Sequence, residues 1–173
     1  DMVMDLRSIN QLDKFQYLPR TDAGNGTLLK GTVYYSMDKS NWTEAGTFDW
    51  KGGDVKTFEF GDKPTARYIK LAVTAGVGNY GSGRELYVFR VPGSESYIPG
   101  DINHDNRIDE NDLTSYMNYT GLRKGDGDYE GYISKGDLNM NGLIDAYDIS
   151  NVGIELETGV SSKKVPAVEG SIS

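Results

Sequence analysis

The chain has 173 residues, a formal net charge of -8, 22 glycines, 12 tyrosines, one histidine and no cysteine. This length allows one domain or two small ones, each with a real core. The lack of cysteine excludes disulfides, thiolate metal sites and thiol nucleophiles. No run of 18 apolar residues occurs, so the sequence contains no candidate membrane-spanning helix.

The excess of negative charge lies in one segment. Residues 1–100 hold 12 acidic and 12 basic side chains, whereas residues 101–158 hold 13 acidic and four basic ones. Such a segment repels nucleic acid and anionic lipid and favours cations. The stretch "RVPGSESYIPGD" (90–101) is rich in Pro, Gly and Ser and predicts a domain boundary. We therefore expect a first domain over 1–92, a linker over 93–99, a second domain over 100–159, and a tail or the start of a following domain over 160–173.

The first hundred residues read as all-β. Short apolar or alternating runs are separated by turn segments such as "DAGNG", "KGGD" and "GDKP". This spacing is typical of a sandwich or jelly roll. The seven expected strands cover residues 2–6, 14–18, 32–36, 47–50, 56–60, 67–73 and 85–91.

The order of several phrases carries a family resemblance. "FQYLPRTDAGNGT", "GTVYYSMDKSNWTEAGTF" and "KPTARYIKLAV", followed by Glu85, resemble the discoidin or coagulation factor type C domain, which includes carbohydrate-binding module family 32. The resemblance implies a galactose-binding-like sandwich. It covers 1–92 but only the later two-thirds of that domain, so we expect the first strands to lie upstream of Asp1.

The same resemblance implies a sugar site in loops at one end of the sandwich. The matching residues are Arg20, Asn25 and Tyr80, with Asn79 beside the last. A guanidinium and an amide suit hydroxyl recognition, and a ring suits the apolar face of a sugar. The alternative is that Arg20 and Asn25 only brace the turn "DAGNG" and that Tyr80 is a core-edge residue. Glu85 matches a ligand of a structural calcium in the family, or is an ordinary rim glutamate.

An acidic phrase occurs twice in the second half. "GDINHDNRID" begins at Gly100 and "GDLNMNGLID" at Gly136. Both fit a 12-residue loop of the EF-hand kind, in which alternate residues turn oxygen atoms inward toward calcium. Asn106 and Gly142 suit the sharp turn at position 6, and Ile108 and Ile144 at position 8 are apolar residues that could pin the loops together. The predicted ligands of two calcium ions are Asp101, Asn103, Asp105, Arg107, Asp109 and Asp112, and Asp137, Asn139, Asn141, Leu143, Asp145 and Asp148, with position 7 binding through its carbonyl.

Each loop leads into a helical pattern. Asp109 and Asp145 can cap the helices, with an aspartate three residues later in each case. The expected apolar face comprises Leu113, Tyr116, Met117, Ile149, Val152 and Leu156, and Gly159 is the expected stop. A loop with one helix, repeated twice, with Asp at position 12, resembles a type I dockerin, a small all-α calcium-binding domain whose partner is a cohesin module. The family's recognition positions correspond to Glu110 and Asn111, then Ala146 and Tyr147.

Two further segments have more than one interpretation. "DGDYEGYISKGD" (126–137) also fits a calcium loop that would share Asp137 with the loop at 137–148, and we interpret 137–148 as the true loop. The tail "GVSSKKVPAVEGSIS" reads as linker or as the first strand of another β-domain.

Together these resemblances imply the noncatalytic C-terminal region of a secreted, extracytoplasmic glycoside hydrolase of the β-N-acetylhexosaminidase or chitobiase kind. Its partners would be a glycan and a cohesin-like module, with no nucleic acid and no membrane insertion. The alternative is a structural calcium-binding spacer that binds neither sugar nor cohesin. A catalytic role is disfavoured because the one histidine, His104, falls at a variable loop position and the clustered carboxylates match calcium positions.

Overall fold

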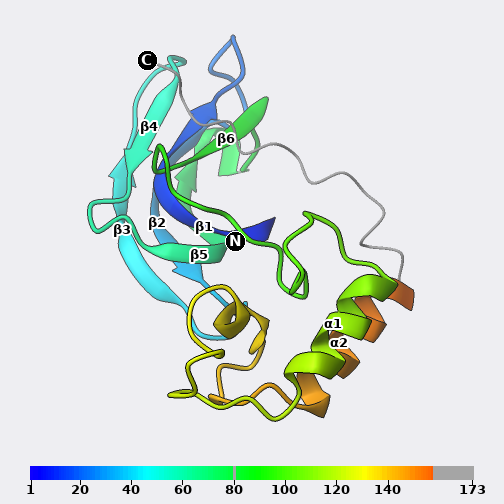
Figure 1. Ribbon diagram of the computed structural model, residues 1–173. Coiled ribbons are helices and arrows are strands. Elements are labelled where there is room, and N and C mark those ends of the chain that lie inside the picture. The colour runs from blue at the N-terminus through cyan, green and yellow to red at the C-terminus, as the bar shows by residue number, and fades with distance from the viewer. Residues whose placement is uncertain (80, 158–173) are drawn as a thin grey trace. The chain divides into compact units, whose positions relative to one another are not determined.

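The computed structural model describes residues 1–79 and 81–157, which fall into two compact units (Figure 1). Unit 1 includes residues 1–96 and unit 2 begins at Tyr97, within the predicted linker. Tyr97 lies in unit 2, where its ring is 6.2 Å from that of Tyr132. The predicted tail and the stop at Gly159 lie outside the described residues. None of the helices among these residues is long and apolar enough to cross a membrane.

Unit 1 is an all-β sandwich whose sheets share one long strand. The strands are β1 (Met2–Leu18), β2 (Leu28–Ser36), β3 (Thr43–Asp49), β4 (Lys56–Glu59), β5 (Thr65–Gly76) and β6 (Glu85–Arg90). All pairings are antiparallel. The first part of β1 pairs with β5 and continues the order β3-β2-β5-β1, whereas its second part pairs with β4 and β6.

The prediction of seven strands is wrong at one place. The runs 2–6 and 14–18 belong to the single strand β1, which has a register shift between Asp5 and Asn10. Arg7 in this interval has a positive φ of 63°, and the strand irregularity lies here. The interval looked like a connection because it contains Ser8 and Asn10, yet both are buried, and the Asn10 amide donates to the Ser8 carbonyl at 2.9 Å.

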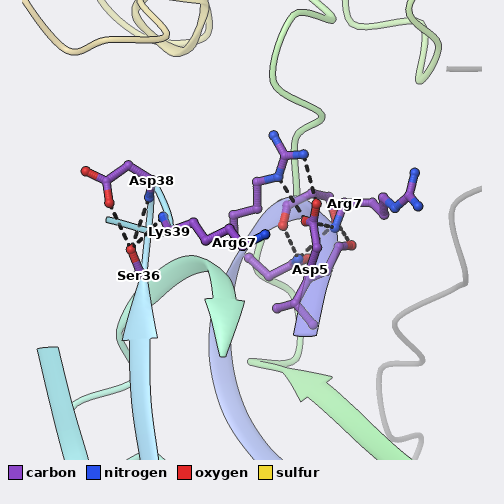
Figure 2. Close-up of polar contacts among 9 residues, drawn as sticks. Asp5, Arg7, Ser36, Asp38, Lys39 and Arg67 are labelled. Atoms are coloured by element: carbon purple, nitrogen blue, oxygen red, sulfur yellow. Dashed lines mark hydrogen bonds and ion pairs between the residues drawn. The ribbon is translucent and has the colours of Figure 1, made fainter. Parts of the chain in front are cut away.

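An ion pair joins β1 to β5 at this irregularity (Figure 2). Asp5 accepts two hydrogen bonds from Arg67, at 2.9 and 3.1 Å, and a third from the backbone N–H of Arg7. Burial alone would raise the pKa of Asp5, but the hydrogen bonds from Arg67 and Arg7 outweigh it and hold this pKa below its usual value. Figure 2 also shows Ser36 and Asp38 in the turn that follows β2. Asp38 accepts the N–H groups of Ser40 and Asn41, which closes that turn.

The core of unit 1 contains a cluster of aromatic side chains. The Phe15 ring stacks on Phe58 at 5.3 Å, and Trp50 stacks on Phe48 at 4.1 Å and on Tyr17 at 5.7 Å. Aromatic pairs add to the stabilisation that burial of their area provides. This cluster fixes the strands from whose ends the predicted sugar-contacting loops emerge.

Unit 2 contains two α-helices, α1 (Glu110–Tyr119) and α2 (Ala146–Glu157), which pack side by side (Figure 1). A short 3₁₀ helix, η2 (Ile133–Gly136), lies between them in sequence. The predicted capping of α1 is confirmed: Asp109 is its N-cap and forms a capping box with Asp112. The buried core residues of unit 2 are Ile102, Tyr116, Tyr129, Ile144 and Val152.

The predicted apolar face of the helices is wrong at Met117. Its side chain is 73% exposed, whereas its neighbour Tyr116 is fully buried. Tyr116 reaches inward because its hydroxyl donates to the Gly136 carbonyl at 2.9 Å. The remaining predicted positions all lie in or against the core of unit 2.

Candidate functional site

The loop between β1 and β2 carries Arg20 and Asn25, two of the predicted sugar-contacting residues. Both residues are exposed. Asp22 closes the turn by accepting the Gly24 N–H at 2.9 Å, a hydrogen bond that does not involve the Arg20 side chain. Among the described residues, the Arg20 guanidinium pairs only with Asp22, at 3.5 Å, and is 56% exposed. Most of its five N–H donors are therefore available to a ligand.

The segment 77–82 lies against this loop. Gly26 donates to the Val77 carbonyl at 2.7 Å, and Ser82 donates to the Gly26 carbonyl at 2.7 Å. The Asn25 side chain lies over Gly78, since a Cβ added there would be 2.7 Å from its Oδ1. The structure thus brings Arg20, Asn25 and the segment that leads to Tyr80 to one end of the sandwich. Tyr80 itself lies outside the described residues.

Tyr17 also lies at this end, although the sequence predicted it only as a strand residue. Its hydroxyl donates to the Ser82 carbonyl at 2.6 Å and accepts the Leu28 N–H at 3.2 Å, while the ring is 2% exposed. It therefore ties both loops to the core. Nothing in the local sequence marks this hydroxyl, because the contact with Ser82 spans 65 residues.

Gly26 allows the two loops to approach closely. Its φ is +95°, and an added Cβ would lie 1.9 Å from Ser82 Oγ and 2.8 Å from Ser82 Cβ. Any other residue at this position would therefore have a strained backbone, and its side chain would push the loops apart.

Two other features lie near this end. A cavity of about 500 Å³ lies between the first residues of β1 and residues 73–76 of β5, and it reaches Asn79. Glu85, the first residue of β6, is exposed and accepts the Tyr87 hydroxyl at 2.5 Å.

The two acidic loops of unit 2 repeat the same hydrogen bonds at the same positions. At position 1, Asp101 accepts the N–H groups of Asp105 and Asn106, and Asp137 accepts those of Asn141 and Gly142. The turn residues Asn106 and Gly142 have positive φ values of 67° and 84°. Repetition at this level shows that the two phrases form the same local structure.

Position 12 repeats as well. Asp112 accepts the N–H groups of Ile102 and Asp109, and Asp148 accepts those of Leu138 and Asp145. Each aspartate therefore joins the start of its loop to the first turn of its helix.

The carboxylates at positions 1 and 12 are buried. Asp101, Asp112, Asp137 and Asp148 are between 0 and 5% exposed, and none has an ion-pair partner among the residues that the structure describes. Burial raises the pKa values of Asp101, Asp112 and Asp148, and the carboxylates nearby add to the effect. The backbone hydrogen bonds offset only part of the cost of burying these charges, and a bound cation would reduce it further.

The donor set suits a hard cation that binds oxygen. Each loop combines two buried carboxylates with amide or carboxylate oxygens at positions 3, 5 and 9 and a carbonyl at position 7, the oxygen set that Ca²⁺ takes. Within residues 1–79 and 81–157, no three His, Cys, Asp or Glu side chains are grouped closely enough to hold a metal. The fit therefore depends on amide and backbone oxygens in addition to the carboxylates.

The insert between the repeats contacts both loops. Tyr129, 6% exposed, donates its hydroxyl to Asp137 Oδ2 at 2.7 Å. Burial, together with this hydrogen bond, raises the pKa of Tyr129 to about 12, so the phenol keeps its proton at neutral pH. The Tyr132 hydroxyl donates to the Asp101 carbonyl at 2.7 Å, and its ring stacks on His104 at 3.9 Å. Neither tyrosine was among the site residues predicted from the sequence.

The alternative loop 126–137 does not form the repeated pattern. Asp126 turns back to accept the Arg123 N–H, and η2 occupies the residues before Asp137.

The two position-8 isoleucines do not pair the loops through their backbones. Ile144 lies in the core of unit 2 and Ile108 packs against it, but the Ile144 backbone pairs with Gly121 and Leu122.

Comparison with known proteins identifies unit 1. Residues 1–86 match the F5/8 type C domain, and this part of the chain is an F5/8 type C domain.

Several solved structures are similar to about half of the chain. One is the module CpGH89CBM32-5 of Clostridium perfringens in complex with GalNAc-β-1,3-galactose, with 35% identity over 47% of this chain and 58% of that one and a TM-score of 0.45. The family 32 module of C. perfringens NanJ with galactose has 26% identity over 50% of this chain and 63% of that one, TM-score 0.46. The C-terminal domain of a Bacteroides fragilis chitobiase has 26% identity over 51% and 61%, TM-score 0.45. The chain thus spans less than two thirds of each.

Proposed function

We propose that this chain is a noncatalytic region of a secreted glycoside hydrolase, in which unit 1 holds the enzyme on a glycan. The observation that carries the proposal is that an F5/8 type C domain places Arg20 and Asn25 on one loop, exposed, at the end of the sandwich where segment 77–82 packs. A guanidinium and an amide in fixed loops offer several directional donors and an acceptor to sugar hydroxyls.

Tethering explains the benefit of such a module. Binding to a glycan raises the local concentration of substrate for a linked catalytic domain without taking part in its chemistry. The parent enzyme would be of the β-N-acetylhexosaminidase kind and would act outside the cytoplasm, as the sequence resemblance implies.

For unit 2 we propose a dockerin-like function with two calcium ions. One ion would be held by Asp101, Asp112 and the other predicted ligands of the first loop. The second ion would be held by Asp137, Asp148 and the other predicted ligands of the second loop. The supporting observation is the repeated hydrogen-bond pattern around carboxylates that are buried and have no ion-pair partner within residues 1–79 and 81–157. When bound, calcium supplies the positive charge that these carboxylates need in the folded state.

We propose that the two helices of unit 2 bind a cohesin-like module. The candidate recognition positions differ between the repeats, with Glu110 and Asn111 in one and Ala146 and Tyr147 in the other; Tyr147 is 54% exposed. The alternative, a calcium-stabilised spacer without a partner, predicts that a cohesin panel retains none of the chain in a pull-down, whereas docking predicts retention that chelator abolishes.

The glycan proposal is tested by a glycan array with the complete chain, followed by calorimetry on any hit. Arg20→Ala and Asn25→Ala should each weaken binding at least tenfold. Arg90→Ala, a matched arginine on β6 away from these loops, should leave binding unchanged. A blank array, or binding that is indifferent to Arg20→Ala, would overturn the proposal.

A further inference from the structure

The two loops of unit 2 differ at their first aspartate. The Asp101 carboxylate accepts two backbone N–H groups, at 3.0 and 2.9 Å. The Asp137 carboxylate accepts the two equivalent groups, at 3.1 and 2.7 Å, and in addition the phenol of Tyr129 at 2.7 Å. Asp137 Oδ2 therefore has two donors where the corresponding Asp101 oxygen has one.

The extra donor comes from the insert that separates the repeats. Tyr129 is buried in the core of unit 2 with Ile144 and Val152, so its ring is held by packing and its hydroxyl is fixed in place. Tyr132, three residues later, reaches the other loop but donates to the backbone carbonyl of Asp101, not to its side chain. One tyrosine thus orients a carboxylate, and the other anchors a backbone.

The orientation of Asp137 has a consequence for the second loop. The carboxylate is 5% exposed, so water cannot replace a lost donor easily. With Oδ2 held by Tyr129 and the Gly142 N–H, the plane of the carboxylate is fixed relative to the loop. Hydrogen bonds of this kind around a metal ligand commonly contribute about 10–100-fold to metal affinity.

We infer that Tyr129 is a positioning residue for the second loop and sets the cation affinity of that loop separately from the first. This inference rests on the proposed calcium binding. It gives the insert a role that neither repeat supplies: a side chain from outside the 12-residue loop holds the first aspartate in its binding orientation.

The experiment is a calcium titration of the complete chain followed by ¹H–¹⁵N NMR. The Gly142 amide reports the second loop, since its N–H donates to Asp137, and the Asn106 amide reports the first, since its N–H donates to Asp101. Tyr129→Phe keeps the ring and removes the hydroxyl. It should weaken the second-loop affinity about tenfold or more and leave the first within about twofold. Tyr132→Phe is the matched control and should leave the second-loop affinity unchanged.

The outcomes separate this inference from the calcium proposal. If neither amide of the wild-type chain responds to calcium, the calcium proposal fails and this inference fails with it. If both respond and Tyr129→Phe leaves the second-loop affinity unchanged or raises it, calcium binding stands and the role of Tyr129 is wrong. Should the variant not fold, the wild-type chain decides: the Tyr129 hydroxyl proton should exchange slowly with water, and rapid exchange would contradict the inference.

Discussion

Asp148→Asn tests the cation requirement of unit 2 with a change of almost no volume. Asp148 is fully buried and accepts two backbone N–H groups, from Leu138 at 2.8 Å and from Asp145 at 2.8 Å. Asparagine has one acceptor oxygen, so one of these N–H groups faces an NH₂ group and loses its partner. An unsatisfied buried donor costs about 1–3 kcal/mol.

The variant also removes a buried negative charge. Burial and the neighbouring Asp137 raise the pKa of Asp148, so without calcium the charged form is unfavourable. Removing this charge offsets part of the free energy lost with the hydrogen bond. In chelator we therefore expect the variant to unfold at a urea concentration close to that of the wild type. In calcium the two should separate, because calcium at 100 times its Kd adds about 2.7 kcal/mol per site to the wild type, and the variant lacks the position-12 ligand of its second loop.

The assay is urea unfolding monitored by circular dichroism at 222 nm, with calcium and with chelator. This signal reports unit 2, since both α-helices of the described chain lie there. The matched control is Asp128→Asn, an exposed aspartate of the insert outside the two loops, which should keep the whole calcium-dependent gain. If Asp148→Asn gains as much stability from calcium as the wild type, the assignment of Asp148 as a ligand is wrong.

Three other predictions concern unit 1. Gly26→Ala should destabilise unit 1 by about 1–3 kcal/mol and weaken any glycan binding, because φ is +95° and the added Cβ would clash with Ser82. The control is Gly61→Ala, where an added Cβ meets open space, and equal effects of the two substitutions in thermal unfolding would refute this prediction. Tyr17→Phe should raise amide hydrogen exchange at Leu28 and around Ser82 while the strands stay protected, and unchanged exchange would count against it. The pKa of Asp5 is held below its usual value, so its ion pair with Arg67 stabilises the fold above the usual aspartate pKa and is lost as the pH falls through the lowered one; the stability advantage of the wild type over Asp5→Asn should therefore shrink in acid, and an advantage constant with pH would contradict this.

The sequence predicted the local features well because they depend on neighbours in the chain. The cap at Asp109 follows from the spacing of two aspartates, and the approximate positions of the strands, though not their ends, follow from apolar alternation and turn residues. The joined strand β1 was missed because Ser8 and Asn10 are polar yet buried, and the Asn10 side-chain N–H group donates to the Ser8 carbonyl and hydroxyl. A period-two pattern cannot show such a pair.

The unpredicted parts of the candidate sites depend on contacts distant in sequence. Tyr17 meets a loop 65 residues away, and the bond from Tyr129 to Asp137 arises from how the insert folds back on the second loop. Met117 matched the helical period but points outward, because the helix turns Tyr116 inward to reach Gly136. Tertiary packing decided these three positions.

The central claim is that the loop end of unit 1 binds glycan, and the most direct test is to map where a sugar binds. The complete chain, labelled with ¹⁵N, would be titrated with a panel of neutral hexoses and N-acetylhexosamines, with the amide shifts followed residue by residue. We predict that at least one sugar shifts amides in residues 20–27 and 77–82, leaves those around Ser36 and Asp38 at the other end of β2 unmoved, and loses this effect in Arg20→Ala. Shifts confined to another surface, or no shift with any sugar of the panel, would contradict the account.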